Sequence, residues 1–196
     1  MKIYCATTNP GKLREFQQAI GRFGEGRLEV EPMPGLAVIR PCEETGGTFE
    51  ENAIEKAVYY SGFAPGPLFV DDSGLEVTAL GGAPGVLSAR FAGEGAGDDA
   101  NNRLLLERLD GISVRTAQFV CVVALADCGQ LLGTFRGEVQ GEITGAPRGA
   151  GGFGYDPLFY YEPFGCTFGE ASAEQKISVS HRARALEQMV DYLKLG

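Results

Sequence analysis

Apolar residues recur along this chain with two spacings, and each spacing predicts one type of element. Short apolar runs and alternating apolar positions predict β-strands at residues 2–6, 68–70, 75–80, 115–126 and 131–143. Apolar residues three and four positions apart predict helices at residues 10–23, 49–61, 99–109 and 180–195. We therefore predict a mixed α/β fold, with a long twisted mixed β-sheet flanked by helices, formed by residues 1–196 as a single domain.

The first predicted helix begins directly after a strand, and this junction is a candidate anion site. Asn9 is a favourable N-cap, and Pro10 takes the first helical position, where its missing N–H costs nothing. Backbone N–H groups and the helix dipole attract anions to such an N-terminus, and Lys12 adds a full positive charge. The alternative is a well-capped turn without a ligand, because the loop contains neither G-x-G-x-x-G nor a P-loop sequence.

Two further helix starts can be located from their capping residues. Thr48 and Glu51 have the spacing of a capping box, and Asp98 is expected to cap the helix at 99–109. Within the helix that follows Thr48, Asn52 and Lys56 are four positions apart, so their side chains share a face and can reach one ligand. Since a lysine on a helix is usually just solvated, a role for Lys56 depends on its neighbours in the fold.

Two consecutive carboxylates, Asp71 and Asp72, follow the apolar run 68–70. Their burial is costly unless they are solvated, paired or bound to a cation, and oxygen ligands suit Mg²⁺ or Mn²⁺ better than zinc. In extended backbone the two side chains point to opposite sides, so we expect Asp72 to face the site and Asp71 to be a supporting or second-metal residue. We interpret Ser73 and Gly74 as a turn that presents Asp72; the alternative is an ordinary polar turn.

A glycine-rich loop at residues 145–154 leads into Tyr155 and Asp156. The absence of large side chains lets backbone approach a ligand closely, and Phe153 and Tyr155 offer flat faces on which a base could stack. The alternative is a flexible linker.

The last predicted helix begins after Ser180, which places the chain's only histidine, His181, and Arg182 in its first turn. A cation there opposes the helix dipole, so Arg182 is easier to explain as an anion or carbonyl contact than as a source of stability. Catalysis by a Ser–His or Cys–His pair would depend on His181, and no serine or cysteine lies in a nucleophile-elbow sequence.

Composition excludes several classes of function. The net charge of −9, from 17 Lys+Arg against 26 Asp+Glu, argues against a broad nucleic-acid or anionic-membrane surface. Five cysteines without a C-x-x-C argue against a disulfide framework and against structural zinc. With neither a signal peptide nor an apolar stretch of about 18–20 residues, we expect a soluble cytoplasmic protein.

Five blocks of sequence, in order, resemble the inosine triphosphate pyrophosphatase family. They are ATTNPGKLREF, EETGGTFEENAIEKA, VDDSGLEVTALGGAPGVLSARFAG, GGFGYDPLF and KISVSHRARAL, and together they extend over almost the whole chain. The resemblance implies hydrolysis of ITP, dITP or XTP to the monophosphate and pyrophosphate, with Mg²⁺ (or Mn²⁺) as cofactor. It also implies a homodimer and two lobes with an active-site cleft between them.

The resemblance also implies roles for particular residues. Asp72 matches the general base and a metal ligand, and Glu43 matches the second metal ligand, with the adjacent Glu44 as the alternative. Ser73 and Lys56 match substrate contacts. The remaining substrate contacts fall in three places. The phosphate loop consists of Thr7, Thr8, Asn9, Pro10, Gly11 and Lys12, and the nucleoside loop consists of Phe153, Gly154, Tyr155 and Asp156. The other three contacts are Lys176, His181 and Arg182.

Two other functions stay open at this point. One is a nucleoside triphosphate pyrophosphatase of broader specificity, and the other is a nucleotide sensor that does not hydrolyse. The acids at positions 43, 71 and 72 and the lysines argue against the sensor, which needs affinity but no metal-activated water. No residue that senses the purine 2-amino group, and so excludes GTP, can be identified from the sequence.

Overall fold

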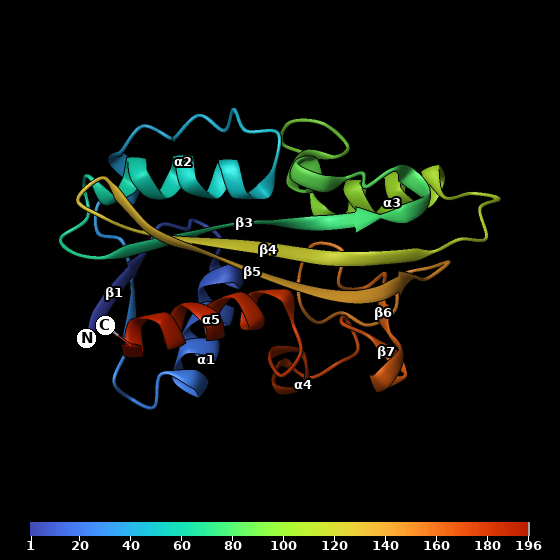
Figure 1. Ribbon diagram of the computed structural model, residues 1–196. Helices are drawn as coiled ribbons and strands as arrows, with labels where there is room; N and C mark the ends of the chain where they lie inside the picture. The colour runs from blue at the N-terminus through green and yellow to red at the C-terminus, as the bar shows by residue number, and fades with distance from the viewer. Residues whose placement is uncertain (196) are drawn as a thin grey trace. The chain divides into compact units, whose positions relative to one another are not determined.

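The computed structural model describes residues 1–195, which form a seven-stranded mixed sheet with helices on its faces (Figure 1). The strands are β1 (Lys2–Cys5), β2 (Glu29–Pro32), β3 (Leu68–Val77), β4 (Thr116–Asp127), β5 (Gln130–Ile143), β6 (Phe159–Tyr161) and β7 (Cys166–Thr167). Their order is β2-β1-β3-β4-β5-β6-β7. Strand β1 pairs in parallel with β2 and β3, and β6 pairs antiparallel with β5 and β7, which confirms the predicted mixed sheet.

The α-helices agree closely with the apolar periodicity of the sequence. They are α1 (Pro10–Phe23), α2 (Phe49–Ser61), α3 (Asp98–Arg108), α4 (Ala173–Ile177) and α5 (His181–Leu195). Short 3₁₀ helices occur at Leu36–Val38, Thr78–Leu80, Gly85–Arg90 and Glu162–Phe164. The five-residue α4 is too short to give a periodic apolar pattern, which is why the sequence did not predict it.

The chain divides into two compact units, each built from segments that are distant in sequence. The first unit contains Met1–Asp72, Cys121–Gly137 and the chain from His181 onward; the second contains Ser73–Val120 and Glu138–Ser180. Strands β3, β4 and β5 each contribute residues to both units. A single domain over residues 1–196 stays a prediction.

In the first unit, α2 covers one face of the sheet while α1 and α5 pack together on the other (Figure 1). The ring of Phe16 on α1 meets the ring of Phe69 on β3 edge-on, with centroids 5.2 Å apart. Phe16, Phe69 and Ile20 are almost completely buried. Burial of such side chains supplies about 1.5–3 kcal/mol each, which fixes α1 against β3.

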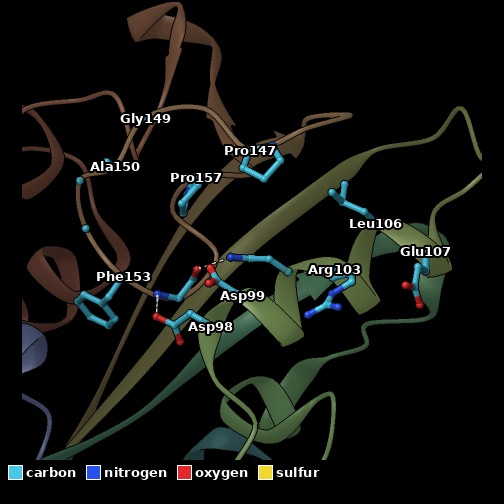
Figure 2. Close-up of a pocket in the computed structure, with 14 residues that line it drawn as sticks. Asp98, Asp99, Arg103, Leu106, Glu107, Pro147, Gly149, Ala150, Phe153 and Pro157 are labelled. Carbon is cyan, nitrogen blue, oxygen red and sulfur yellow. Dashed lines mark hydrogen bonds between the residues drawn. The ribbon is translucent and has the colours of Figure 1, made fainter.

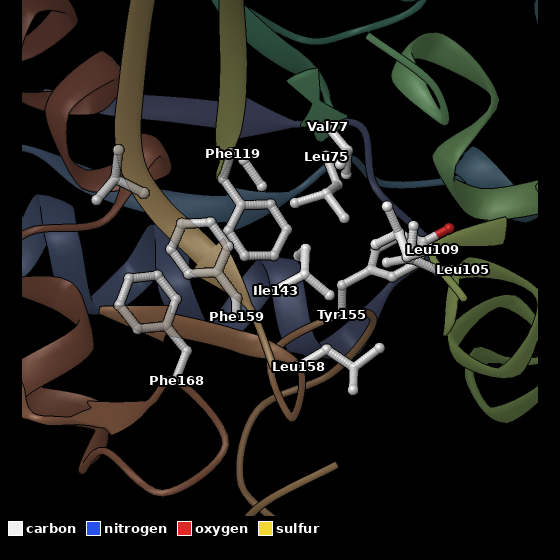
Figure 3. Packing of buried hydrophobic residues seen from close by; sticks show 12 residues of the cluster. Leu75, Val77, Leu105, Leu109, Phe119, Ile143, Tyr155, Leu158, Phe159 and Phe168 are labelled. Carbon is white, nitrogen blue, oxygen red and sulfur yellow. The ribbon is translucent and has the colours of Figure 1, made fainter. Parts of the chain in front are cut away.

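The second unit has its own aromatic core (Figure 3). The ring of Phe159 lies 4.5 Å from that of Phe119 and 5.0 Å from that of Phe168, measured between centroids. The same cluster contains Leu105, on α3, and Leu109, the C-cap residue of α3, as the apolar spacing at 99–109 predicted. This packing holds α3 against the sheet.

The turn predicted at Ser73 and Gly74 is wrong. Strand β3 continues without interruption from Leu68 to Val77 and includes both residues. At Gly74 a Cβ atom would lie 2.6 Å from the carbonyl oxygen of Gly85 and would also collide with Ser88. Glycine is therefore needed because another segment approaches the strand closely, and no turn is required.

Two of the predicted helix caps are confirmed, and the cap predicted at Ser180 stays a prediction. Asn9 accepts hydrogen bonds from the N–H groups of Gly11 and Lys12, and Thr48 forms a complete capping box with Glu51. The cap predicted at Asp98 is wrong, because Gly97 is the N-cap residue and Asp98 is the first residue of the helix. The Asp98 carboxylate accepts instead from the N–H of Gly154, a contact distant in sequence.

No helix within residues 1–195 combines the length and the apolar character that crossing a membrane requires. The five cysteines are all free thiols, which agrees with the expectation that there is no disulfide framework.

Candidate active site

Asp71 is buried in the first unit between two cations. Its carboxylate lies 2.9 Å from Lys12 Nζ, on α1, and 3.5 Å from Arg182 Nε, on α5. Burial by itself would raise the pKa of Asp71, but Lys12, Arg182 and the more distant Lys56 together hold it well below its usual range. Asp71 is therefore ionised at neutral pH and ties α1 and α5 to β3.

Arg182 is buried as well, and a second acid balances its charge. Its Nη1 atom donates to Glu15 Oε2 at 2.9 Å. Burial would lower the pKa of the guanidinium, yet the carboxylates of Glu15 and Asp71 raise it. These two acids explain how a cation is tolerated in the first turn of α5, where it opposes the helix dipole. His181, the first residue of α5, is also buried.

Asp72 points to the opposite face of β3, as expected for consecutive residues in a strand. Lys56 Nζ lies 2.8 Å from Asp72 Oδ1, and Asn52 Nδ2 donates to Asp72 Oδ2 at 3.3 Å. Both partners lie on α2, four positions apart, so the prediction that they can reach one group is confirmed. Burial, with smaller contributions from the Asp71 and Glu44 carboxylates, raises the pKa of Asp72 despite the ion pair with Lys56.

Lys56 also connects Asp72 to one of the two neighbouring glutamates. Its Nζ atom lies 3.0 Å from Glu44 Oε1. Glu43 pairs instead with Arg40 at 2.9 Å, and its side chain is 74% exposed. Between the two acids that the sequence left open, the geometry places Glu44 beside Asp72 and Glu43 in solvent.

The start of α1 differs from the expected anion site in one respect. Asn9 Oδ1 already accepts from the N–H groups of Gly11, at 2.8 Å, and Lys12, at 3.1 Å. The N–H of Asn9 itself donates to Thr7 Oγ1 at 3.2 Å. These N–H groups therefore have protein partners, and the positive charge of this loop comes mainly from Lys12.

The donors that could hold a metal ion are carboxylate oxygens. Among residues 1–195, no group of three or more His, Cys, Asp or Glu side chains is arranged to hold a metal by itself. Asp72 and Glu44 both approach one ammonium group, that of Lys56, so their oxygens converge on a position where a positive charge is favourable. Two carboxylates, completed by water and phosphate oxygens, are a donor set that fits Mg²⁺.

In the second unit, one carboxylate organises the end of the glycine-rich loop. Asp156 Oδ2 accepts from the N–H of Phe153 at 2.9 Å and is paired with Lys176 Nζ. The Lys176 ammonium lies 5.0 Å from the centroid of the Phe153 ring, within the range of a cation–π contact. Phe153, Asp156 and Lys176, predicted from three positions in the sequence, therefore form one group.

Tyr155 does not offer a stacking face, contrary to the prediction. It is 4% exposed and belongs to the aromatic core, and its hydroxyl donates to the carbonyl oxygen of Ser88 at 2.8 Å. The pKa of this phenol is raised, mainly because the side chain is buried. Phe153 is only partly buried and so remains the candidate for stacking.

The predicted site residues thus form two groups, and each group lies within one unit. Lys12, Lys56, Asp71, Asp72 and Arg182 belong to the first unit, and Phe153, Asp156 and Lys176 belong to the second. Sequence reasoning missed the role of Glu15. Glu15 follows Lys12 by three positions on α1, which places the two on one face, but its partner Arg182 is distant in sequence.

We predict that Asp71→Asn destabilises the protein by about 3–5 kcal/mol at pH 7, because Lys12 loses its buried partner and the buried Arg182 keeps only Glu15. The pKa of Asp71 is lowered by folding, so its ionisation stabilises the protein above the unfolded-state pKa of about 3.9 and less at lower pH. The difference between wild type and variant should therefore narrow by roughly 1 kcal/mol between pH 5 and pH 3. Urea unfolding at each pH measures this, with exposed Asp110→Asn as the control; equal stabilities at pH 7 would contradict it.

Comparisons with known proteins give a consistent family. The model of the Ham1 family matches residues 3–192. The dITP/XTP pyrophosphatase of Acidobacterium capsulatum is 46% identical and that of Geobacter sulfurreducens 45%; the alignments cover 97% and 98% of this chain and 97% and 96% of those proteins. A HAM1 protein from Coxiella burnetii, 38% identical, superposes with a TM-score of 0.87 over the full length of both chains. The Ham1 protein of Staphylococcus aureus, 39% identical, gives 0.86 over 99% of this chain and 98% of that one. This chain belongs to the Ham1 family.

Proposed function

We propose that this protein is a dITP/XTP pyrophosphatase, which cleaves a non-standard purine nucleoside triphosphate to the monophosphate and pyrophosphate. Curated relatives with this name match nearly the whole chain at about 45% identity. The observation that carries the proposal is Asp72, a buried acid with a raised pKa that is held by Lys56 and Asn52. This arrangement suits a base that acts next to a highly charged substrate.

The lysines of the first unit would bind the triphosphate. Lys12 and Lys56 each carry a charge that is at present balanced by Asp71 and Asp72. Incoming phosphate oxygens would share these ammonium groups and stabilise the charge that develops on the pyrophosphate leaving group. We assign the loop from Thr7 to Lys12 to this contact, in which the N–H groups of Gly11 and Lys12 would exchange Asn9 Oδ1 for phosphate oxygens.

We propose Mg²⁺ as the cofactor, held by Asp72 and Glu44, with Glu43 as the less favoured choice because its carboxylate faces Arg40. When bound, the ion neutralises phosphate charge and acts as a Lewis acid. Asp72 has the further task of orienting or deprotonating the attacking water, for which Lys56 and Asn52 hold its carboxylate in place.

The second unit would bind the nucleoside. Phe153 would stack on the purine, and Asp156 and Lys176 fix the loop around it. The donors to the 6-keto oxygen, His181 and Arg182, belong to the first unit, and we assign them on the family resemblance alone. Such donors would meet the 6-amino group of adenine donor to donor, and an unpaired buried donor costs about 1–3 kcal/mol.

Two features of the assembly are part of the proposal. We expect a homodimer, which light scattering after gel filtration would measure as twice the chain mass of 20.8 kDa. A reducing cytoplasmic location would suit the free thiols.

The substrate assignment can be tested with a panel of nucleotides. We expect pyrophosphate release from dITP and XTP in the presence of Mg²⁺, much less from dGTP and dTTP, and none above background after chelation. Comparable turnover of all four nucleotides would indicate a pyrophosphatase of broad specificity. Tight binding without pyrophosphate release would indicate a sensor, and either result would overturn the proposal.

Asp72→Asn should lower kcat for dITP by about 10²–10⁴-fold, because the amide cannot accept the proton of the water. Nucleotide affinity, measured by calorimetry, should change little, since Lys12 and Lys56 are retained. Exposed Asp110→Asn is the matched control. Turnover by Asp72→Asn at a rate near that of wild type would remove Asp72 from its proposed role.

The two adjacent glutamates form a matched pair for the metal assignment. Glu44→Gln should reduce turnover at limiting Mg²⁺ by about 10–100-fold and raise the Mg²⁺ concentration needed for half-maximal rate. Glu43→Gln, one position away and solvent-exposed, should change neither quantity more than twofold. The reverse pattern would assign the metal to Glu43, as the resemblance first suggested.

A further inference from the structure

We propose that Asn102, together with Asp98, positions the nucleoside loop by holding both polar groups of Gly154; this inference rests on the proposed function of Phe153. The N–H of Gly154 donates to Asp98 Oδ2 at 2.6 Å. Asn102 Nδ2 donates to the carbonyl oxygen of Gly154 at 3.0 Å. The two side chains are one helical turn apart on α3, so one face of the helix binds both the N–H and the carbonyl group of Gly154.

The loop has few side chains of its own that could fix its conformation. Residues 145–152 are almost all small, so few side chains are available to pack. Gly152 and Gly154 have φ values of +73° and +62°, a region that glycine enters without cost. Phe153 lies between these two glycines, so the direction of its ring depends on what restrains the residues on either side.

Polar contacts restrain this loop on two sides. From one side, Asp156 accepts the N–H of Phe153 and pairs with Lys176. From the other, α3 contributes Asp98 and Asn102 across an open cavity of about 690 Å³, which the helix and the loop line together (Figure 2). Next to this cavity, the two bonds fix the backbone of Gly154, while the neighbouring Tyr155 packs into the apolar core.

The burial of Asn102 agrees with this role. The residue is 7% exposed, and its Oδ1 atom has no hydrogen-bond partner among residues 1–195. A buried amide oxygen without a partner is unfavourable for stability. Asn102 therefore adopts an orientation that satisfies Gly154 and leaves its own oxygen unsatisfied, as expected of a residue whose contribution is to the site.

The preceding residue offers a matched control. Asn101 lies on the same helix, is 3% exposed, and also makes two bonds to backbone, accepting from Ala92 N–H and donating to the Ala89 carbonyl. Substitution of either asparagine by alanine removes a buried amide from α3. Only Asn102→Ala releases Gly154, whereas Asn101→Ala releases the segment at 89–92.

With dITP as substrate, Asn102→Ala should raise KM about tenfold and change kcat less than threefold, because loss of one bond loosens base stacking without touching the reacting phosphates. Inhibition by inorganic tripolyphosphate, which has no base, should stay within twofold of wild type. Asn101→Ala should leave KM within twofold of wild type, even if it lowers the melting temperature as much as Asn102→Ala does. An unchanged KM for Asn102→Ala, or an equal rise in both variants, would overturn the inference.

A second measurement is independent of activity. Hydrogen exchange of residues 150–156 in the free protein should be faster in Asn102→Ala than in wild type and unchanged in Asn101→Ala. Equal exchange in all three proteins would refute the anchor. If wild type releases no pyrophosphate from dITP or XTP, the proposed function fails, while the exchange experiment still decides whether Asn102 holds the loop.

Discussion

The first unit depends on the ion pairs that two consecutive buried carboxylates, Asp71 and Asp72, form with cations on opposite faces of β3. Asp71 requires cations on one face and receives them from α1 and α5, and Asp72 receives Lys56 from α2 on the other. Unpaired, each buried charge would cost several kcal/mol, so these helices are held in register with the strand by electrostatics as well as by apolar packing. The same contacts bring the proposed phosphate-binding lysines to one strand.

The two acids have opposite pKa shifts although both are buried. Two close cations and the more distant Lys56 outweigh the desolvation of Asp71, so its pKa falls. For Asp72 the ion pair with Lys56 does not outweigh desolvation and the nearby carboxylates, so its pKa rises. The balance of neighbouring charges thus makes Asp71 a fixed anion that stabilises the fold, and Asp72 a candidate base.

The second unit uses a different principle. A rigid aromatic core, which includes Phe159 and Tyr155, lies next to a loop made almost entirely of small residues. Hydrogen bonds fix the loop, from Asp156 on one side and, in our inference, from Asp98 and Asn102 on the other. Polar anchors define a backbone position without filling the space that a nucleoside would need.

The sequence by itself determined whatever depends on residues close together in the chain. The periodic helices, the caps at Asn9 and Thr48, and the shared face of Asn52 and Lys56 follow from spacing alone, because helix geometry relates residues three and four positions apart. Only the tertiary structure distinguished Glu44 from Glu43. It also decided that Tyr155 is buried and that Asp98 binds the N–H of Gly154. It also made β3 continuous through Gly74, where a segment distant in sequence approaches too closely for any side chain. Those outcomes depend on partners far along the chain, which local propensity and spacing do not encode.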